Sequence, residues 1–262
     1  MNKVKTIISK EWAEVFKNRI VLFTVAFLPI VFLALPIITL AAMGSFEDEM
    51  SAGSGEMEAF VGDLCQGLND MACTEVYMLN LYTLLFMLLP VIVPVTIAAY
   101  SIVGEKTSHS LEPLLATPIT TTELLVGKMI AACVPAIAAT WAAFAIYAGA
   151  MWFMVSEEVF KLAMAPMWLV AVFIVAPLMS LMAVSAAVLI SSRVSDPRAA
   201  EQLSAFVILP IILLLIGQSM GLILIDARMI LLLGVLVLVL DVILVTMSVK
   251  LFQREIILTQ WK

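Results

Sequence analysis

The residues of this chain that could do chemistry are few and widely separated. The sole histidine, His109, lies in a polar stretch between two apolar runs, and Glu157 and Glu158 stand in a short loop without histidine partners. Hydrolytic chemistry needs a nucleophile with a nearby base, or a metal held by several ligands. The sequence shows no such set, which argues against an intramembrane enzyme. No catalytic residue, metal site or cofactor of its own is therefore expected.

A nucleotide-binding loop is also missing. The loop that cradles the phosphates of ATP reads Gly-x-x-x-x-Gly-Lys, followed by Ser or Thr. Gly127 and Lys128 are followed by Met129, and Thr122 stands where the first glycine is required. The chain therefore does not bind ATP through this motif, and ATPase activity is expected in another polypeptide.

One carboxylate lies deep within an apolar run. Asp241 stands midway along 229–250, where a charged Asp costs roughly 2.5–3.5 kcal/mol to insert. Two interpretations stay open: Asp241 lines a substrate pathway, or it is protonated and hydrogen-bonded to a neighbouring helix. Gln218, in a glycine-flanked interruption of the preceding run at 217–221, is a second candidate for the pathway.

The elements that must position these residues are membrane helices. Of the 262 residues, 63% are hydrophobic and 13% are charged. A helix needs about 20 apolar residues to span a bilayer, and runs of that length occur at 20–43, 77–101, 129–154, 165–190, 203–225 and 229–250. The sequence therefore predicts an all-α, polytopic membrane protein with six transmembrane helices. Prolines inside the runs predict kinks in a packed bundle.

Lysine and arginine predict the orientation, because they favour the cytoplasmic side of a membrane. With the N-terminus inside, only Lys161 and Arg228 lie outside, so we expect a multi-pass protein of the cell membrane with both termini cytoplasmic. Residues 1–19 are predicted to form an interfacial amphipathic helix. That helix is either an anchor or part of a docking surface. Its apolar stripe consists of Val4, Ile8, Trp12, Val15 and Phe16.

The predicted outer loop, 44–76, holds eight acidic residues and no basic one. These carboxylates either attract cations or form an ordinary solvated surface. Cys65 and Cys73 lie in the same loop, where an oxidising exterior would permit a disulfide. Two reduced thiols are the alternative.

The polar stretch 102–128 contains signals for two helix starts. Thr120 and Glu123 have the spacing of a capping box, which would begin the helix of the third span. Ser110 can cap a short helix over 111–116, which the Thr117-Pro118 pair would end. The leucines of that short helix could enter a groove of a partner or pack onto the membrane helices.

This stretch resembles the signature loop of type-2 ATP-binding-cassette (ABC) permeases of the export type. The matching residues are Glu105-Lys106, Ser110-Leu111-Glu112, Leu114-Leu115, Thr117-Pro118, Glu123-Leu124-Leu125 and Gly127-Lys128. The basic N-terminus, the six runs and the closing segment 251–255 are similar to that family too. The acidic outer loop departs from it, because it is larger than a minimal hairpin.

The resemblance implies a single permease domain over 1–262, whose cytoplasmic coupling helix seats on a separate ABC ATPase. ATP and Mg would bind in that ATPase, and ATP-driven alternating access would export a substrate. The permease would pair as a homodimer or heterodimer in the lipid bilayer, with no nucleic-acid partner. The implied coupling residues are Glu105, Lys106, Ser110, Leu111, Glu112, Leu114 and Leu115. An ATP-independent carrier with Asp241 as its proton or ion site is the alternative.

Overall fold

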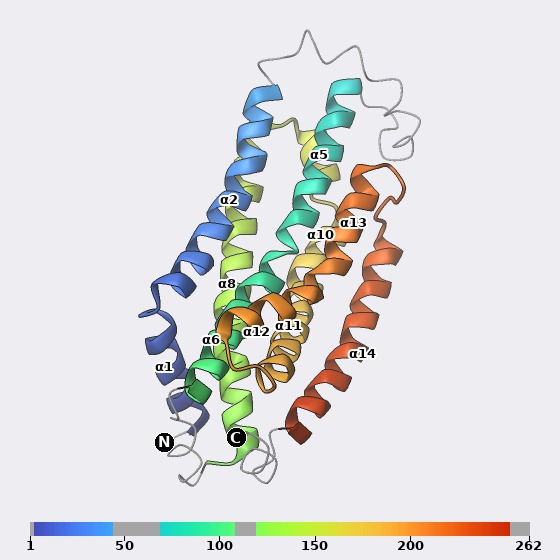
Figure 1. Cartoon of the computed structure of the whole chain (residues 1–262). Helices are drawn as coiled ribbons and strands as arrows, with labels where there is room; N and C mark the ends of the chain where they lie inside the picture. Colours follow the sequence, from blue (N-terminus) through green and yellow to red (C-terminus); the bar gives the residue numbers. More distant parts are fainter. Residues whose placement is uncertain (1–2, 44–68, 108–118, 252–262) are drawn as a thin grey trace.

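The computed structural model describes residues 3–43, 69–107 and 119–251, which form helices and no strand. A π-helical turn, η1 (Ala171–Val175), joins α10 to α11, and a 3-10 turn, η2 (Ala205–Ile208), joins α12 to α13. In chain order the helices are α1 (Lys3–Val15), α2 (Arg19–Met43), α5 (Asp70–Phe86), α6 (Leu89–Thr107), α8 (Thr121–Met154), α9 (Glu157–Ala163), α10 (Pro166–Val170), α11 (Ala176–Ser191), α12 (Pro197–Ser204), α13 (Leu209–Ser219) and α14 (Ala227–Leu251) (Figure 1).

Six helical segments are long and apolar enough to cross a membrane, which confirms the predicted fold class. They are α2, α5 with α6, α8, α10 through α11, α12 through α13, and α14. The second segment starts earlier than predicted, inside the stretch assigned to the outer loop. Asn69 explains this start, because its side-chain oxygen accepts a hydrogen bond from the Ala72 N–H at 2.8 Å and caps α5.

Three of these segments are interrupted just before a proline. Pro90, Pro177 and Pro210 each stand at the second position of α6, α11 and α13, respectively. Proline has no N–H, so it cannot continue the hydrogen bonding of the preceding helix. The turn at 87–88, the π-helical turn and the 3-10 turn are the resulting breaks.

The predicted break near residue 217 is confirmed. Helix α13 ends at Ser219, and Gly221 follows with φ 76°, a left-handed conformation that favours glycine. The Gly217 carbonyl accepts the Leu222 N–H at 2.8 Å and the Ile223 N–H at 3.2 Å. The chain therefore turns back within a few residues to begin α14.

The core of the bundle lies around α6 and α11. Helix α11 packs against α6, α8, α12 and α14, whereas α2, α13 and α14 bury few of their apolar side chains. Leu213 and Leu232, for example, are 66% and 70% exposed. An apolar exterior of this kind is suited to lipid rather than to water.

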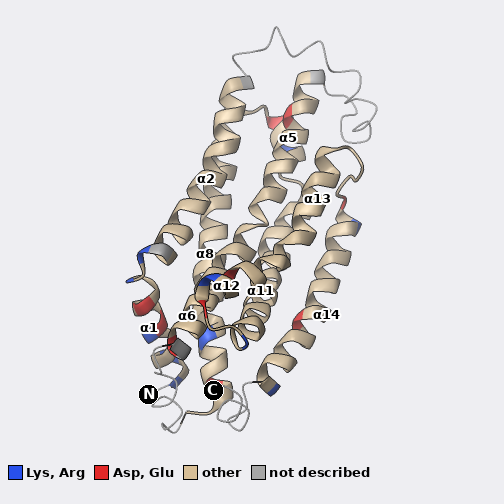
Figure 2. Ribbon diagram, viewed as in Figure 1, with Lys and Arg blue, Asp and Glu red and all other residues tan. Residues whose placement is uncertain are grey.

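Charged residues gather mainly at the two ends of the bundle (Figure 2). We call the end that carries α1 the α1 end, and the opposite end, which carries α9, the α9 end. The α1 end also holds the end of α6, the start of α8 and the end of α14 (Figure 1). The segment 108–118 therefore joins two helices whose near ends both lie beside α1.

Candidate functional site

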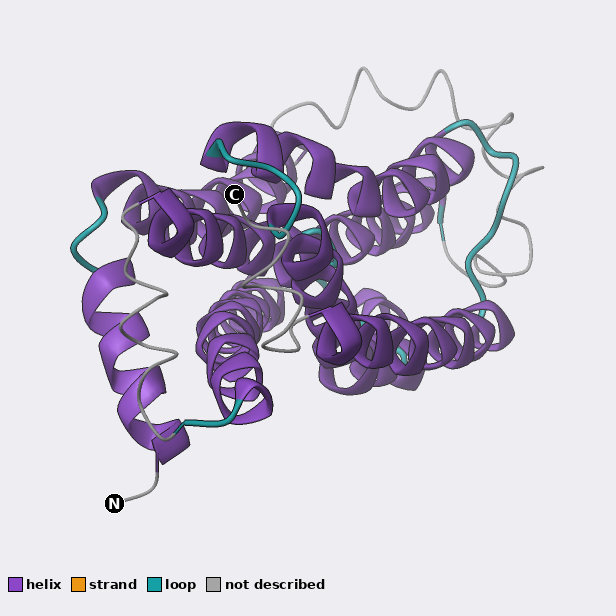
Figure 3. Ribbon diagram, turned by 60° about the horizontal axis from the view of Figure 1, so that its bottom comes forward, coloured by secondary structure: helices purple, strands orange, loops and turns teal. Residues whose placement is uncertain are grey.

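Helix α1 is docked against the protein at the α1 end. Its buried residues, Ile7, Glu11 and Val15, recur every four positions and therefore share one face, which packs mainly on α8. Trp12 adds a hydrogen bond from its ring N–H to the Ala131 carbonyl at 3.0 Å. Phe16, from the predicted apolar stripe, is 53% exposed. Figure 3 turns this end toward the viewer and shows the N-terminal helix at the rim of the bundle.

Gly127 makes this close docking possible. A Cβ atom at position 127 would lie only 2.7 Å from Ile7 Cγ2 and 3.0 Å from Ile7 Cβ. Any larger residue would therefore push α1 away from α8. The next residue, Lys128, then points its ammonium group into the same junction.

Lys128 forms the centre of a buried ion-pair cluster, which consists of Lys10, Glu11, Ser101, Glu105 and Lys128. The Lys128 ammonium lies 2.8 Å from Glu11 Oε1 and 2.7 Å from Glu105 Oε2, and it donates to Ser101 Oγ at 2.8 Å. The Lys128 and Glu11 side chains are only 3% and 2% exposed. Glu11 Oε1 and Ser101 Oγ accept hydrogen bonds from the ammonium group, and Glu105 adds an ion-pair contact.

The cluster continues from Glu105 to Lys10. Lys10 Nζ donates to Glu105 Oε1 at 2.6 Å, so the two oxygens of Glu105 face two different ammonium groups. Burial alone would lower the pKa of Lys10, but its hydrogen bond to Glu105 and the nearby carboxylate charges outweigh burial and raise it. Ser101 closes the cluster by donating to Glu11 Oε2 at 2.5 Å.

The cluster connects three helices with groups that are costly to separate. Removing one partner of a buried ion pair leaves an uncompensated charge and typically costs about 3–5 kcal/mol. An exposed pair is worth about 0–1 kcal/mol, and the pair between Lys3 and Glu123 at 3.6 Å is of that kind. The buried cluster therefore makes α1, α6 and α8 behave as one unit at their shared end.

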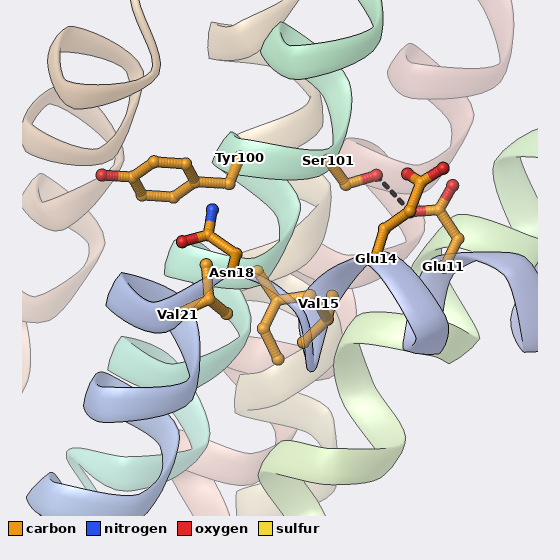
Figure 4. A pocket seen from close by; sticks show the side chains of 8 residues that line it. Glu11, Glu14, Val15, Asn18, Val21, Tyr100 and Ser101 are labelled. Carbon is orange, nitrogen blue, oxygen red and sulfur yellow. Dashed lines mark hydrogen bonds between the residues drawn. The ribbon is translucent and has the colours of Figure 1, made fainter.

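A cavity of about 190 Å³ lies beside the cluster (Figure 4). Glu11, Glu14 and Glu105 each bring a carboxylate oxygen within 4.8 Å of the others, a spacing that could hold a metal ion. However, the ammonium groups of Lys10 and Lys128 already lie among these oxygens. The geometry therefore favours ion pairing over metal binding. The cavity is lined by Glu11, Glu14, Val15, Asn18, Val21, Ile97, Tyr100 and Ser101.

The predicted coupling residues fall into three groups. Glu105 is 4% exposed and is held inside the chain, so the structure gives no support to a direct contact between Glu105 and a partner. Lys106 belongs to the last turn of α6. Ser110, Leu111, Glu112, Leu114 and Leu115 lie outside the described residues.

Sequence reasoning missed the cluster because its members are far apart in the chain. Glu11 carried a usable signal, since it stands four residues from both Ile7 and Val15 on a face that proved to be buried. A carboxylate on an apolar face needs a cation opposite it. Lys128, beside a helical glycine, was the corresponding signal on α8.

A family model described as ABC-2 family transporter protein matches residues 5–229. The chain belongs to the ABC-2 transporter family. The match runs from α1 to the start of α14, so it covers the docked helix, the cluster and five complete spans. The protein is therefore an ABC transporter permease, a transport subunit without an ATP-binding site of its own. No curated protein matches the sequence of this permease.

The capping box of the permease is present as predicted. Thr120 Oγ1 accepts the Glu123 N–H at 3.2 Å, and Glu123 Oε2 accepts the Thr120 N–H at 2.8 Å. This reciprocal pair begins α8 two turns before Lys128. The start of α8 is thereby fixed relative to the buried cluster.

The two candidate pathway residues lie apart from the cluster. Asp241 is 3% exposed on α14, and neither of its oxygens has a hydrogen-bond partner among the described residues. The hydrogen-bonded alternative for Asp241 therefore finds no partner in the described part of the chain. Gln218 is also 3% exposed, and its backbone carbonyl accepts the Tyr77 hydroxyl at 2.6 Å. Neither residue lines the cavity beside the cluster.

The cysteines of the permease differ in state. Cys133 is a free, buried thiol in α8. Cys73 in α5 is disulfide-bonded. Cys65 lies outside the described residues, so its pairing with Cys73 stays a prediction.

Proposed function

We propose that this permease moves a substrate outward by ATP-driven alternating access, powered by a separate ABC ATPase. The observation that supports this proposal most is the buried cluster at the α1 end. It connects α1 with the last turns of α6 and the first turns of α8, the two helices that flank segment 108–118. A force applied to that segment would reach two membrane spans through a junction centred on the buried Lys128, Glu11 and Glu105 side chains.

The shape of the connected spans suits such a transmission. Helix α8 continues without interruption for 34 residues. The α5–α6 segment covers 35 residues, and 78% of the residues in its most apolar 18-residue stretch are buried. Helix α2, joined to α1 by a short turn, packs on α8, α6 and α5. A tilt of α6 and α8 at the α1 end would therefore also move the parts of the spans that lie toward the α9 end.

The ATPase would bind at the α1 end, with Ser110, Leu111, Glu112, Leu114 and Leu115 as its contacts. We place this end in the cytoplasm because most lysines and arginines belong to it. Glu105 would hold α1 and α8 together rather than touch the ATPase. ATP and Mg would bind in the ATPase, and two permease chains, identical or different, would complete the transporter in the cell membrane.

Co-purification and reconstitution test this proposal. The tagged permease, extracted from its own membranes in mild detergent, should bring down an ATPase whose hydrolysis rate changes when both are reconstituted in vesicles. Inside-out vesicles should accumulate members of a panel of fluorescent amphiphiles and lipids only with ATP. Uptake without ATP, driven by a proton gradient and with no ATPase bound, would contradict the proposal and favour the carrier alternative.

A further inference from the structure

Asp241 lies in a seam between α14 and the rest of the bundle. The buried residues of α14 are Ile230, Val237, Asp241 and Ser248, and the helix packs on α11, η1, α10 and α8. The other faces of α14 carry exposed apolar residues such as Leu232. Helix α14 is therefore held along one narrow strip, in which Asp241 is the acidic member.

Among the residues that the structure describes, none acts as a counterion for the Asp241 carboxyl group in this seam. The packing elements η1, α10 and α11 contain no charged residue, and Lys128, the basic residue of α8, is paired with Glu11 and Glu105. On α14 itself, Arg228 and Lys250 are exposed near the two ends. Lys250 is the nearer of these, about 14 Å along the helix axis.

The polar groups that face Asp241 are neutral. Cys133 on α8 lies within electrostatic reach of Asp241 and near Ser180 on α11. The buried Ser180 hydroxyl has no hydrogen-bond partner among the described residues. The other titratable groups of α8 are engaged elsewhere, since Glu123 caps the helix and the Tyr147 hydroxyl donates to the Leu79 carbonyl at 3.0 Å. A carboxylate would thus be buried in this seam without a cation or a hydrogen bond from any described residue, which is strongly unfavourable at membrane depth.

The seam also contains small and polar contacts. Beyond Asp241, the Ser248 hydroxyl reaches the Ser185 carbonyl at 3.4 Å, and Gly234 lets α14 approach Val175 closely, since an added Cβ would lie 3.3 Å from Val175 Cγ2. Small and polar contacts of this kind release less apolar surface on opening than large interlocked side chains would.

We propose that Asp241 is a proton-binding site that links protonation to the position of α14. With the proton bound, the neutral carboxylic acid lies in the closed seam between α14 and the helices α8 and α11. When the O–H bond breaks, its electron pair stays on the carboxylate and the proton passes to water. The carboxylate then requires water around it, so α14 moves away from α8 and α11. By linkage, an open seam favours loss of the proton to the same extent.

This inference goes beyond the proposed function, because neither ATP nor a substrate enters it. Its tests use the permease alone in lipid vesicles, so their failure would leave the ATPase proposal untouched.

Infrared spectroscopy tests the protonation state directly. At about pH 6, ordinary Asp and Glu carboxyls are ionised. The carbonyl band of a protonated carboxylic acid at that pH would therefore report a buried carboxyl group that has kept its proton. The parent should show this band and lose it as the pH is raised. Asp241→Asn should lack the band, whereas Asp226→Asn, which changes an exposed Asp at the start of α14, should keep it. Absence of the band in the parent, or its persistence in Asp241→Asn, would overturn the proposal.

Labelling of Cys133 tests the movement. N-ethylmaleimide reacts with the thiolate, so ionisation of the thiol alone raises the rate about tenfold per pH unit. Measured by peptide mass spectrometry, the labelling rate of Cys133 should rise more than tenfold per pH unit in the parent and in Asp226→Asn. In Asp241→Asn it should rise only tenfold per pH unit. Equal rates in all three proteins would overturn the link to α14.

If Asp241→Asn does not accumulate, the parent alone decides. Loss of the infrared band and the extra labelling of Cys133 must then occur at the same pH, and a separation of the two transitions would contradict the proposal.

Discussion

Lys128 is the side chain on which the junction at the α1 end depends. Its ammonium group donates to Glu11 and Ser101 and forms an ion pair with Glu105. These partners come from α1 and α6, while Lys128 itself belongs to α8. Its ammonium group is the buried cation that the Glu11 carboxylate faces at 2.8 Å. The effect of a change at Lys128 therefore measures how firmly the three helices are held together.

Replacing Lys128 by Met keeps the volume of the side chain and removes its charge. Glu11 would then be buried without a cation, so we expect a loss of about 3–5 kcal/mol in the free energy of unfolding. The loss can be measured by denaturant titration in mixed micelles. The matched control is Lys161→Met, which removes the cation of an exposed pair with Glu157 in α9 and should leave stability nearly unchanged. Equal losses of unfolding free energy for the two changes would show that the buried cluster stabilises the protein no more than an exposed ion pair does.

A double-mutant cycle isolates the Lys128–Glu11 contact. Glu11→Gln removes the carboxylate that Lys128→Met leaves unpaired, so the double variant should be more stable than the sum of the two single losses predicts. Contacting partners usually differ from additivity by about 0.5–3 kcal/mol, and strict additivity would argue against a direct pair.

Gly127→Ala tests the close approach of α1 to α8. The new methyl group would collide with Ile7, whose Cγ2 lies 2.7 Å from its position, and overpacking of this kind costs about 1–3 kcal/mol. Ile7→Ala in the same chain should recover much of that loss. Gly149→Ala in the same helix is the control, because nothing lies within 4 Å of its added Cβ, and alanine favours a helix more than glycine does. A Gly127→Ala protein as stable as the Gly149→Ala protein would refute the docking geometry.

Among the elements, α8 and its cap could be predicted from the sequence, whereas the docking of α1 could not. The capping box of Thr120 and Glu123 is a local pattern with a spacing of three, and the length of each apolar run is a local property as well. The partner of α1 is determined by contacts between residues about 90 to 120 positions apart, such as Lys10 with Glu105 and Glu11 with Lys128. Hydrophobic periodicity predicts which face of α1 is apolar, but it does not distinguish a face that lies on lipid from one that packs on protein.

The same limit applies to the breaks in the spans. The prolines predicted disturbances, but a sequence does not say which ones interrupt a helix. Pro94 and Pro135 lie inside continuous helices, whereas Pro90, Pro177 and Pro210 follow breaks. The difference depends on which neighbouring helices can satisfy the freed carbonyls, and that is a property of the packed bundle.

The docking of α1 should not change with pH near neutrality. Because Glu105 raises the pKa of Lys10, the stabilisation from their ion pair is fully present below the ordinary lysine pKa of about 10.4. It is lost only as the pH rises through the higher value of the folded protein. A nitroxide on Ser9→Cys, an exposed position of α1, should stay immobile from neutral to mildly alkaline pH. Lys10→Met should make the label more mobile, and a parent label that loosens near pH 8 would contradict this expectation.

The whole molecule is a six-span bundle whose two ends differ in charge, and its orientation follows from that difference. We expect a cysteine at Ser195, exposed near the start of α12, to react with an impermeant maleimide only after the membrane is permeabilised. A cysteine at Glu158, exposed in α9 at the other end, should react in intact cells. The opposite pattern would place the α1 end outside and exclude an ATPase there.

The cluster matters to the whole molecule only if it transmits work from an ATPase to the spans. The decisive measurement is the amount of substrate moved per ATP hydrolysed in vesicles that contain the co-purified complex, compared between the parent, Lys128→Met and Lys161→Met. We predict that Lys128→Met retains its ATPase and hydrolyses ATP but moves much less substrate per ATP, while Lys161→Met matches the parent. A Lys128→Met complex that transports with the parent's ratio would show that the junction of α1, α6 and α8 does not carry the coupling.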